Sequence, residues 1–84
     1  MKLATMIDAV DSKQSLGNFI AALADDCAAN PETWENGTVH QYLLALSRWI
    51  DDSDGYYRNQ GLPVPQTPSW RTIAEMLTAA KVYE

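Results

Sequence analysis

The chain has 84 residues, which is enough for one domain with one modest core, and 46% of its residues are apolar. Its formal net charge is -5, and the six basic residues are scattered singly, which disfavours binding to nucleic acid or to an anionic membrane. This charge permits a basic protein partner without requiring one, and it does not define the oligomeric state. We expect a single helical domain over residues 1–84.

The single cysteine, Cys27, excludes an intramolecular disulfide and a thiolate metal cluster. Residues 1–10 hold one lysine and a very short apolar run before Asp8, so they do not resemble a secretory signal. No later segment approaches the ~18 apolar residues of a membrane span. We therefore expect a cytoplasmic protein.

The first predicted helix covers residues 12–29. Asp11 or Ser12 supplies its N-cap, and Asn30-Pro31 ends it because the residue before a proline is disfavoured in the helical region. For the preceding residues 5–10, the sequence leaves a short helix and an extended segment equally open. The apolar stripe of the predicted helix consists of Leu16, Phe19, Ile20, Leu23 and Cys27.

The second predicted helix covers residues 38–51 and begins with a capping box formed by Thr38 and Gln41. The turn-forming run 51–55, which finishes at Gly55, is expected to end it. Its apolar positions are Val39, Tyr42, Leu43, Leu46, Trp49 and Ile50.

The third predicted helix covers residues 68–82, with Thr67 as N-cap and Pro68 at the first helical position. Between the second and third helices lies a connection, residues 52–67, that is long for a compact domain. We expect it to be ordered, pinned against the helices by Trp34, Tyr56 or Tyr57, and Leu62. The predicted fold is therefore all-α: a small three-helix domain with a long ordered loop between helices two and three.

An ordered set of residues from about Phe19 to the last residue resembles a family of small stand-alone bacterial proteins, a domain of unknown function. The resemblance implies a complete protein, and it implies no reaction and no catalytic residue. It rests on Trp34-Glu35-Asn36, Tyr42-Leu43, Trp49, Gly55-Tyr56-Tyr57, Asn59, Pro68, Trp70, Ala74, Leu77, Ala79, Ala80 and Tyr83-Glu84.

No residue pattern indicates a metal, cofactor or catalytic site. The acidic run before Gly55 resembles a calcium loop, but the positions of its first and last ligands fall on Ile50 and Gly61, which cannot serve. His40 is expected on the surface, and Cys27, on an apolar stripe, is expected to be structural. We also expect Trp49 and Trp70 in the core.

The sequence favours a non-enzymatic protein-interaction module, such as a regulator, an adaptor or a toxin-neutralising partner. Its expected contact surface is the loop 51–58, where carboxylates adjoin two tyrosines. The alternative is a small-molecule-binding or catalytic domain with a pocket between the loop and the helices, lined by Asn59, Tyr57 and Glu35. The candidate interaction residues are Asp51, Asp52, Asp54, Tyr56, Tyr57 and Arg58.

Overall fold

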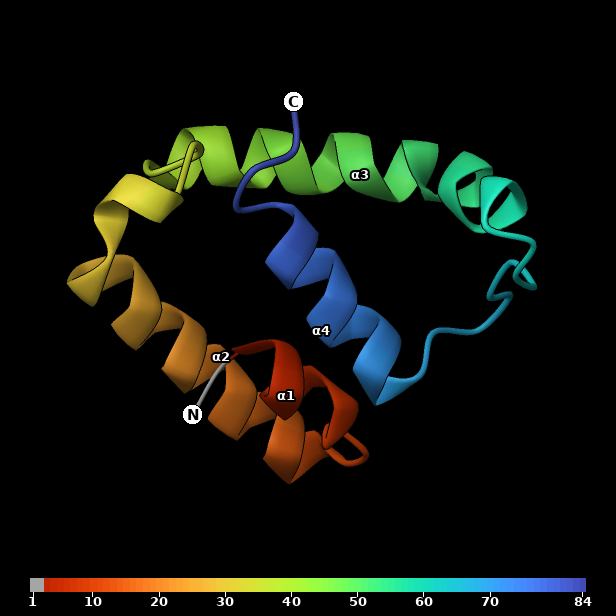
Figure 1. Ribbon diagram of the computed structural model, residues 1–84, viewed down its shortest axis with the longest axis horizontal. Helices are drawn as coiled ribbons and strands as arrows, with labels where there is room; N and C mark the ends of the chain where they lie inside the picture. The colour runs from red at the N-terminus through yellow and green to blue at the C-terminus, as the bar shows by residue number, and fades with distance from the viewer. Residues whose placement is uncertain (1–2) are drawn as a thin grey trace.

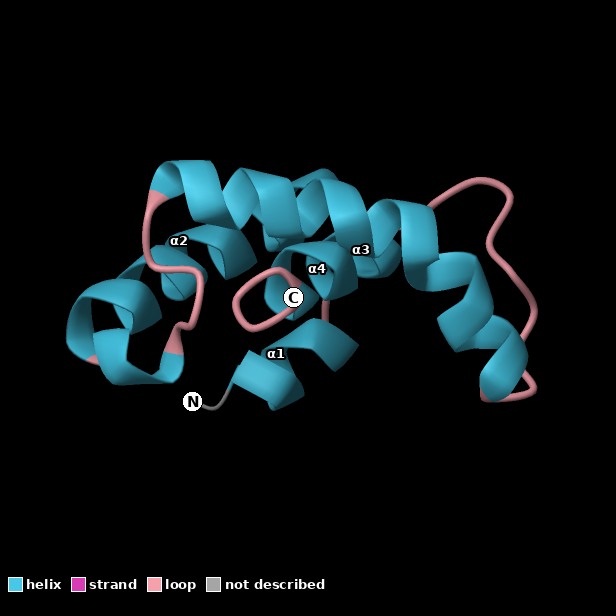
Figure 2. Ribbon diagram, turned by 90° about the horizontal axis from the view of Figure 1, so that it is seen from above, coloured by secondary structure: helices cyan, strands magenta, loops and turns pink. Residues whose placement is uncertain are grey.

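The computed structural model describes residues 3–84, and its regular elements in that range are all helices (Figures 1 and 2). The all-α prediction is confirmed, but there are four α-helices instead of three because residues left open by the sequence form α1. No helix among the described residues is long and apolar enough to cross a membrane. The elements are α1 (Leu3–Asp8), α2 (Lys13–Ala29), the 3₁₀ turn η1 (Pro31–Thr33), α3 (Val39–Asn59) and α4 (Trp70–Ala79).

Helix α4 is the central element, because α1, α2 and α3 all pack against it. Helices α2 and α3 diverge from η1 and each packs on α4 instead of on the other (Figure 1). Two alanines of this region are fully buried: Ala74 on the packed side of α4 and Ala80 at its C-cap. Their small side chains let neighbouring elements approach closely.

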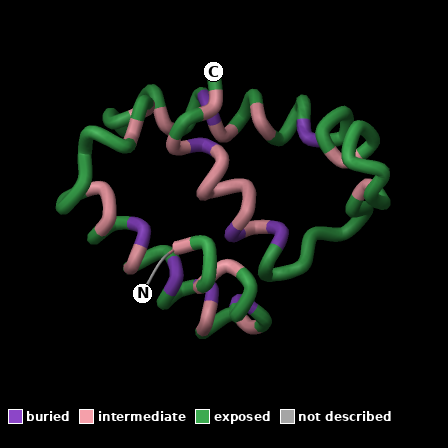
Figure 3. Tube along the Cα trace, in the orientation of Figure 1, coloured by how far each residue is buried: buried purple, intermediate pink, exposed green. Residues whose placement is uncertain are grey.

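The core lies where α1, α2 and α4 meet (Figure 3). Phe19 is only 1% exposed, and Leu16 and Leu23 flank it on the same face of α2. Trp70, predicted in the core, is instead 43% exposed at the start of α4. Burial of a large apolar side chain such as Phe19 contributes about 1.5–3 kcal/mol to folding.

Helix boundaries follow their caps. The Ser12 hydroxyl accepts a hydrogen bond from the Ser15 backbone nitrogen at 3.1 Å, and the Thr38 hydroxyl accepts one from the Gln41 backbone nitrogen at 3.1 Å. The predicted N-caps are confirmed, but the capping box predicted at Thr38 is formed only in this half, without the return hydrogen bond from the Gln41 side chain. The predicted start of the third helix was wrong by two residues. The Ser69 hydroxyl accepts from the Thr72 nitrogen at 3.1 Å, so the N-cap is Ser69 and not Thr67.

Helix α3 does not end at residues 51–55, and the predicted long loop is therefore shorter. Ser53 is buried and its hydroxyl donates to the Ile50 carbonyl at 3.0 Å, so the packed face of the helix continues through it. The helix ends at a Schellman motif: Gly61 has φ 69°, and the Leu62 nitrogen donates to the Tyr57 carbonyl at 2.9 Å. The connection to α4 is thus residues 60–69, and whether it is ordered stays a prediction.

The predicted anchors of the loop also differ from the structure. Leu62 is half exposed, and the two tyrosines belong to α3 itself. Trp34 follows η1 and packs against the core cluster and Tyr42, so it pins the α2–α3 connection instead.

Candidate functional site

The six predicted interaction residues all lie on the last turns of α3, where the helical twist of 100° per residue spreads them around the axis. Asp51, Asp54 and Arg58 share one exposed side. Asp52 and Tyr56, spaced by four, lie on a different side, and Tyr57 is half-buried on a third. The structure therefore does not bring the six together in one loop surface, and their role in binding stays a prediction.

Several of these side chains already hold the fold together. Tyr83 donates its hydroxyl hydrogen to Asp52, and this hydrogen bond is the main reason why the pKa of Tyr83 is raised. The Tyr56 ring lies 5.2 Å from Trp49 and 5.4 Å from Tyr57, measured between ring centres. This aromatic cluster joins α3 to the C-terminal residues, since the Trp49 ring also lies 5.3 Å from that of Tyr83.

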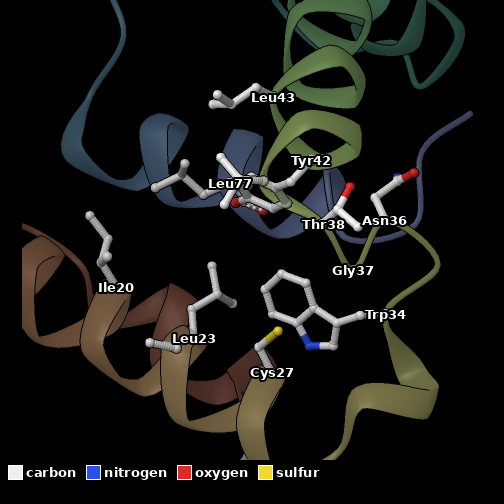
Figure 4. Close-up of a pocket in the computed structure, with 12 residues that line it drawn as sticks. Ile20, Leu23, Cys27, Trp34, Asn36, Gly37, Thr38, Tyr42, Leu43 and Leu77 are labelled. Carbon is white, nitrogen blue, oxygen red and sulfur yellow. Dashed lines mark hydrogen bonds between the residues drawn. The ribbon is translucent and has the colours of Figure 1, made fainter.

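A second candidate site is the groove between α2 and α3, at the end where the two helices converge on η1 (Figure 4). We call it the α2–α3 groove. Its volume is about 440 Å³, within the roughly 300–1,000 Å³ of typical ligand sites. Leu77 of α4 contributes to its floor. Its lining consists of Ile20, Leu23, Ala24, Cys27, Trp34, Asn36, Gly37, Thr38, Val39, Tyr42, Leu43 and Leu77.

Large apolar side chains on both walls of the groove are exposed to solvent. Ile20 on α2 is 44% exposed, and on α3 Val39 is 76% and Leu43 56% exposed. Val39 and Leu43, spaced by four, lie on the same face of α3. Exposed apolar side chains that line one groove are typical of interaction sites, because their burial by a partner removes apolar surface from water.

The polar groups that line the groove are engaged within the fold. The Trp34 indole nitrogen donates to Asp26 Oδ2 at 2.8 Å, and the Tyr42 hydroxyl donates to the Leu77 carbonyl at 2.6 Å. The Asn36 amide donates to two carbonyls beyond α4, at 3.0 and 2.8 Å. The groove therefore presents apolar surface, with few polar groups left to orient a polar ligand.

At the end of the groove beside η1, the Trp34 side chain contacts an ion pair formed by Asp26 and Lys81. Lys81 Nζ lies 3.0 Å from Asp26 Oδ2 and 5.1 Å from the centre of the Trp34 ring. The hydrogen bond from Trp34, followed by that from Lys81, lowers the pKa of Asp26 below 3.8. Asp26 is therefore a carboxylate at neutral pH, and it fixes the indole that closes this end of the groove.

The described residues contain no arrangement of three His, Cys, Asp or Glu side chains that could hold a metal ion. The acidic residues before Gly55 lie on a continuous helix, not in a loop. His40 is exposed, as predicted. Cys27 is half-buried, and it lines the groove instead of lying deep in the core.

Comparison with known families matches residues 12–84 to the model of a family of unknown function, DUF7660. The chain belongs to that family. The resemblance inferred from the residues between Phe19 and Glu84 is thereby confirmed at the level of a family of unknown function. Comparison with curated proteins and with solved structures gave no match.

The groove was missed by sequence reasoning, although its residues were in view. Ile20, Val39 and Leu43 were assigned to apolar stripes because they follow helical spacing. In the structure all three reach solvent: Ile20 and Leu43 lie at one edge of their stripes, and Val39 lies in the first turn of α3. No local signal separates them from the buried positions, because each stripe has the width that is typical of a helix packed on a core.

Proposed function

We propose that this member of the DUF7660 family is a non-enzymatic protein-interaction module that binds a partner through the α2–α3 groove. The observation that supports this most directly is an apolar groove with exposed Ile20, Val39 and Leu43 on its walls. Protein interfaces bury such side chains at their centre. A regulator, an adaptor and a toxin-neutralising partner are all consistent with a module of this kind.

A polar small molecule or a reaction is a weaker candidate. Ligand sites combine an apolar lining with a few free, convergent polar groups. Here Trp34, Asn36 and Tyr42 use theirs within the fold. The pocket expected for that alternative, lined by Asn59, Tyr57 and Glu35, is not the groove, which shares none of the three.

The exposed side of α3 that carries Asp51, Asp54 and Arg58 is a second candidate surface. Its carboxylates would steer a basic partner toward the protein and mainly affect the association rate. We assign it the accessory role, because its three residues offer charge without apolar area.

Two adjacent residues of α3 test the groove directly. Leu43 lines it and is 56% exposed, whereas Leu44 is 42% exposed and lies outside the lining. Both Leu→Glu variants should fold, because each side chain already reaches water. Tagged wild type, Leu43→Glu and Leu44→Glu would be used to capture partners from the source organism, with thermal unfolding as a control for the fold.

The proposal predicts a partner that the wild type and Leu44→Glu retain and that Leu43→Glu loses by more than about tenfold. Equal capture by the two folded variants would exclude the groove as the binding site. If partner capture were lost with Asp51→Asn and Asp54→Asn but not with Leu43→Glu, the binding site would be the acidic side of α3 instead.

A further inference from the structure

We infer that the occupant of the α2–α3 groove is a single amphipathic α-helix of the partner, oriented with basic residues at the end beside η1. This inference rests on the proposed function and specifies its partner.

The shape of the groove matches a helix. Its walls are α2 and α3, which diverge from η1, and Leu77 of α4 lies between them (Figures 1 and 4). Both walls pack on α4 and not on each other. A space bounded by three helices in this way accepts the apolar face of one more helix, with its side chains between Ile20 and Leu43.

The backbone chemistry of the walls disfavours an extended peptide. A bound strand needs free backbone donors and acceptors along its binding surface, as at a sheet edge. The groove walls are helices, whose backbone groups are paired within each helix except for the first amides of α3 beside η1. A partner helix brings its own backbone hydrogen bonds, so it buries apolar side chains here without leaving amide groups unpaired.

The charge near η1 favours a basic helix end. Residues 25–35 contain four carboxylates and no lysine or arginine. Of these, Asp26 is paired with Lys81, and Asp25 lies on the side of α2 that faces away from the groove. Glu32 and Glu35, which flank the groove-lining Trp34 in sequence, are exposed. Lysine or arginine at the adjoining end of the partner would be attracted by the charges of Glu32 and Glu35, whereas glutamate there would be repelled.

A second copy of this chain is a poorer occupant. Two copies would bring together two net charges of -5. A stable dimer also needs about 800 Å² of buried surface on each subunit, far more than the three exposed side chains of the groove walls supply.

The test is a selection from displayed peptides of about 16 residues, a length that spans about 24 Å as a helix. One pool has apolar residues at i, i+3, i+4 and i+7, and the other has the same composition with alternating apolar residues. In both pools the terminal positions vary among lysine, glutamate and glutamine. Selected peptides are then tested against Leu43→Glu, against Leu44→Glu and against Glu32→Gln combined with Glu35→Gln.

The inference predicts enrichment of the helical pool with lysine at one end. Affinity should fall at least tenfold with Leu43→Glu, stay unchanged with Leu44→Glu, and fall several-fold with the double Gln variant. Enrichment of the alternating pool, of glutamate ends, or of neither pool would overturn the inference. In that case, if capture of the natural partner still depended on Leu43, the proposed function would stand and only the inference of a partner helix would fail. If capture did not depend on Leu43, both would fail.

Discussion

The hydroxyl of Tyr83 donates a hydrogen bond to the carboxylate of Asp52, which joins the end of the chain to the middle of α3. The hydrogen bond gives Asp52 a structural partner, although the sequence predicted it as a free contact residue. The Tyr83 ring also packs against the Trp49 ring, with 5.3 Å between the two ring centres. The acidic segment of α3 therefore serves the fold on one side and faces solvent on the other.

Replacing Asp52 by Asn should lower the pKa of Tyr83. The negative carboxylate holds the phenol proton, and this hydrogen bond is the first cause of the raised pKa. NMR titration of the Tyr83 ring in wild type and Asp52→Asn would measure the change. Asp51→Asn, one residue away and exposed, is the control and should leave the Tyr83 titration unchanged.

Replacing Gly55 by Ala should stabilise the protein by about 0.5–1 kcal/mol. Gly55 lies inside α3, its φ is not positive, and an added Cβ meets no atom within 4 Å. Gly61→Ala should instead destabilise by roughly 1–2 kcal/mol, because Gly61 has φ 69°. Urea unfolding of the two variants would check both signs, and a destabilising Gly55→Ala would indicate a turn at residues 51–55.

The sequence predicted the all-α class, both ends of α2 and the start of α3, because caps and proline act over a few residues. It misplaced the end of α3 for a physical reason. The acidic residues and Gly55 suggested a turn, while the buried face continued through Ser53, a small polar residue that an apolar count omits. The actual end signal was Gly61.

The groove was beyond prediction because it depends on how α2 and α3 diverge across α4. Helical spacing shows that Ile20 and Leu23 share a face of α2, but not that Leu23 is 4% exposed and Ile20 44%. The same limit applies to Trp34, whose partners Asp26 and Lys81 lie 8 and 47 residues away. Such arrangements come from tertiary packing, which local patterns do not encode.

Replacing Asp26 by Asn should destabilise the protein at pH 6 and less so at about pH 3, where the pH lies below the unfolded pKa of a carboxyl group. The folded pKa of Asp26 lies below 3.8, so its charge stabilises the fold above that value and this contribution is lost as the pH falls through the folded pKa. Urea unfolding midpoints at both pH values would measure the difference. Asp25→Asn, an exposed neighbour, should show a small effect at either pH.

Replacing Asn36 by Ala should destabilise the protein by about 1–3 kcal/mol. The Asn36 side-chain amide donates to the carbonyls of Ala80 and Tyr83, and the variant loses both hydrogen bonds. It keeps the hydrogen bond from the backbone nitrogen of residue 36 to the Lys81 carbonyl at 3.0 Å. These bonds hold the α2–α3 connection against the end of α4. Thermal unfolding would measure the loss, and Asn59→Ala at the exposed end of α3 should stay within about 0.5 kcal/mol.

The most direct test of the groove as the binding site is the rate at which iodoacetamide alkylates Cys27. Cys27 is the only cysteine in the chain, is half-buried and lines the groove, so its thiol reports whether the groove is covered. We predict severalfold slower alkylation when the captured partner or a selected helix is bound, in the wild type and in Leu44→Glu alike. An unchanged rate in a complex shown to be intact by co-elution would contradict it.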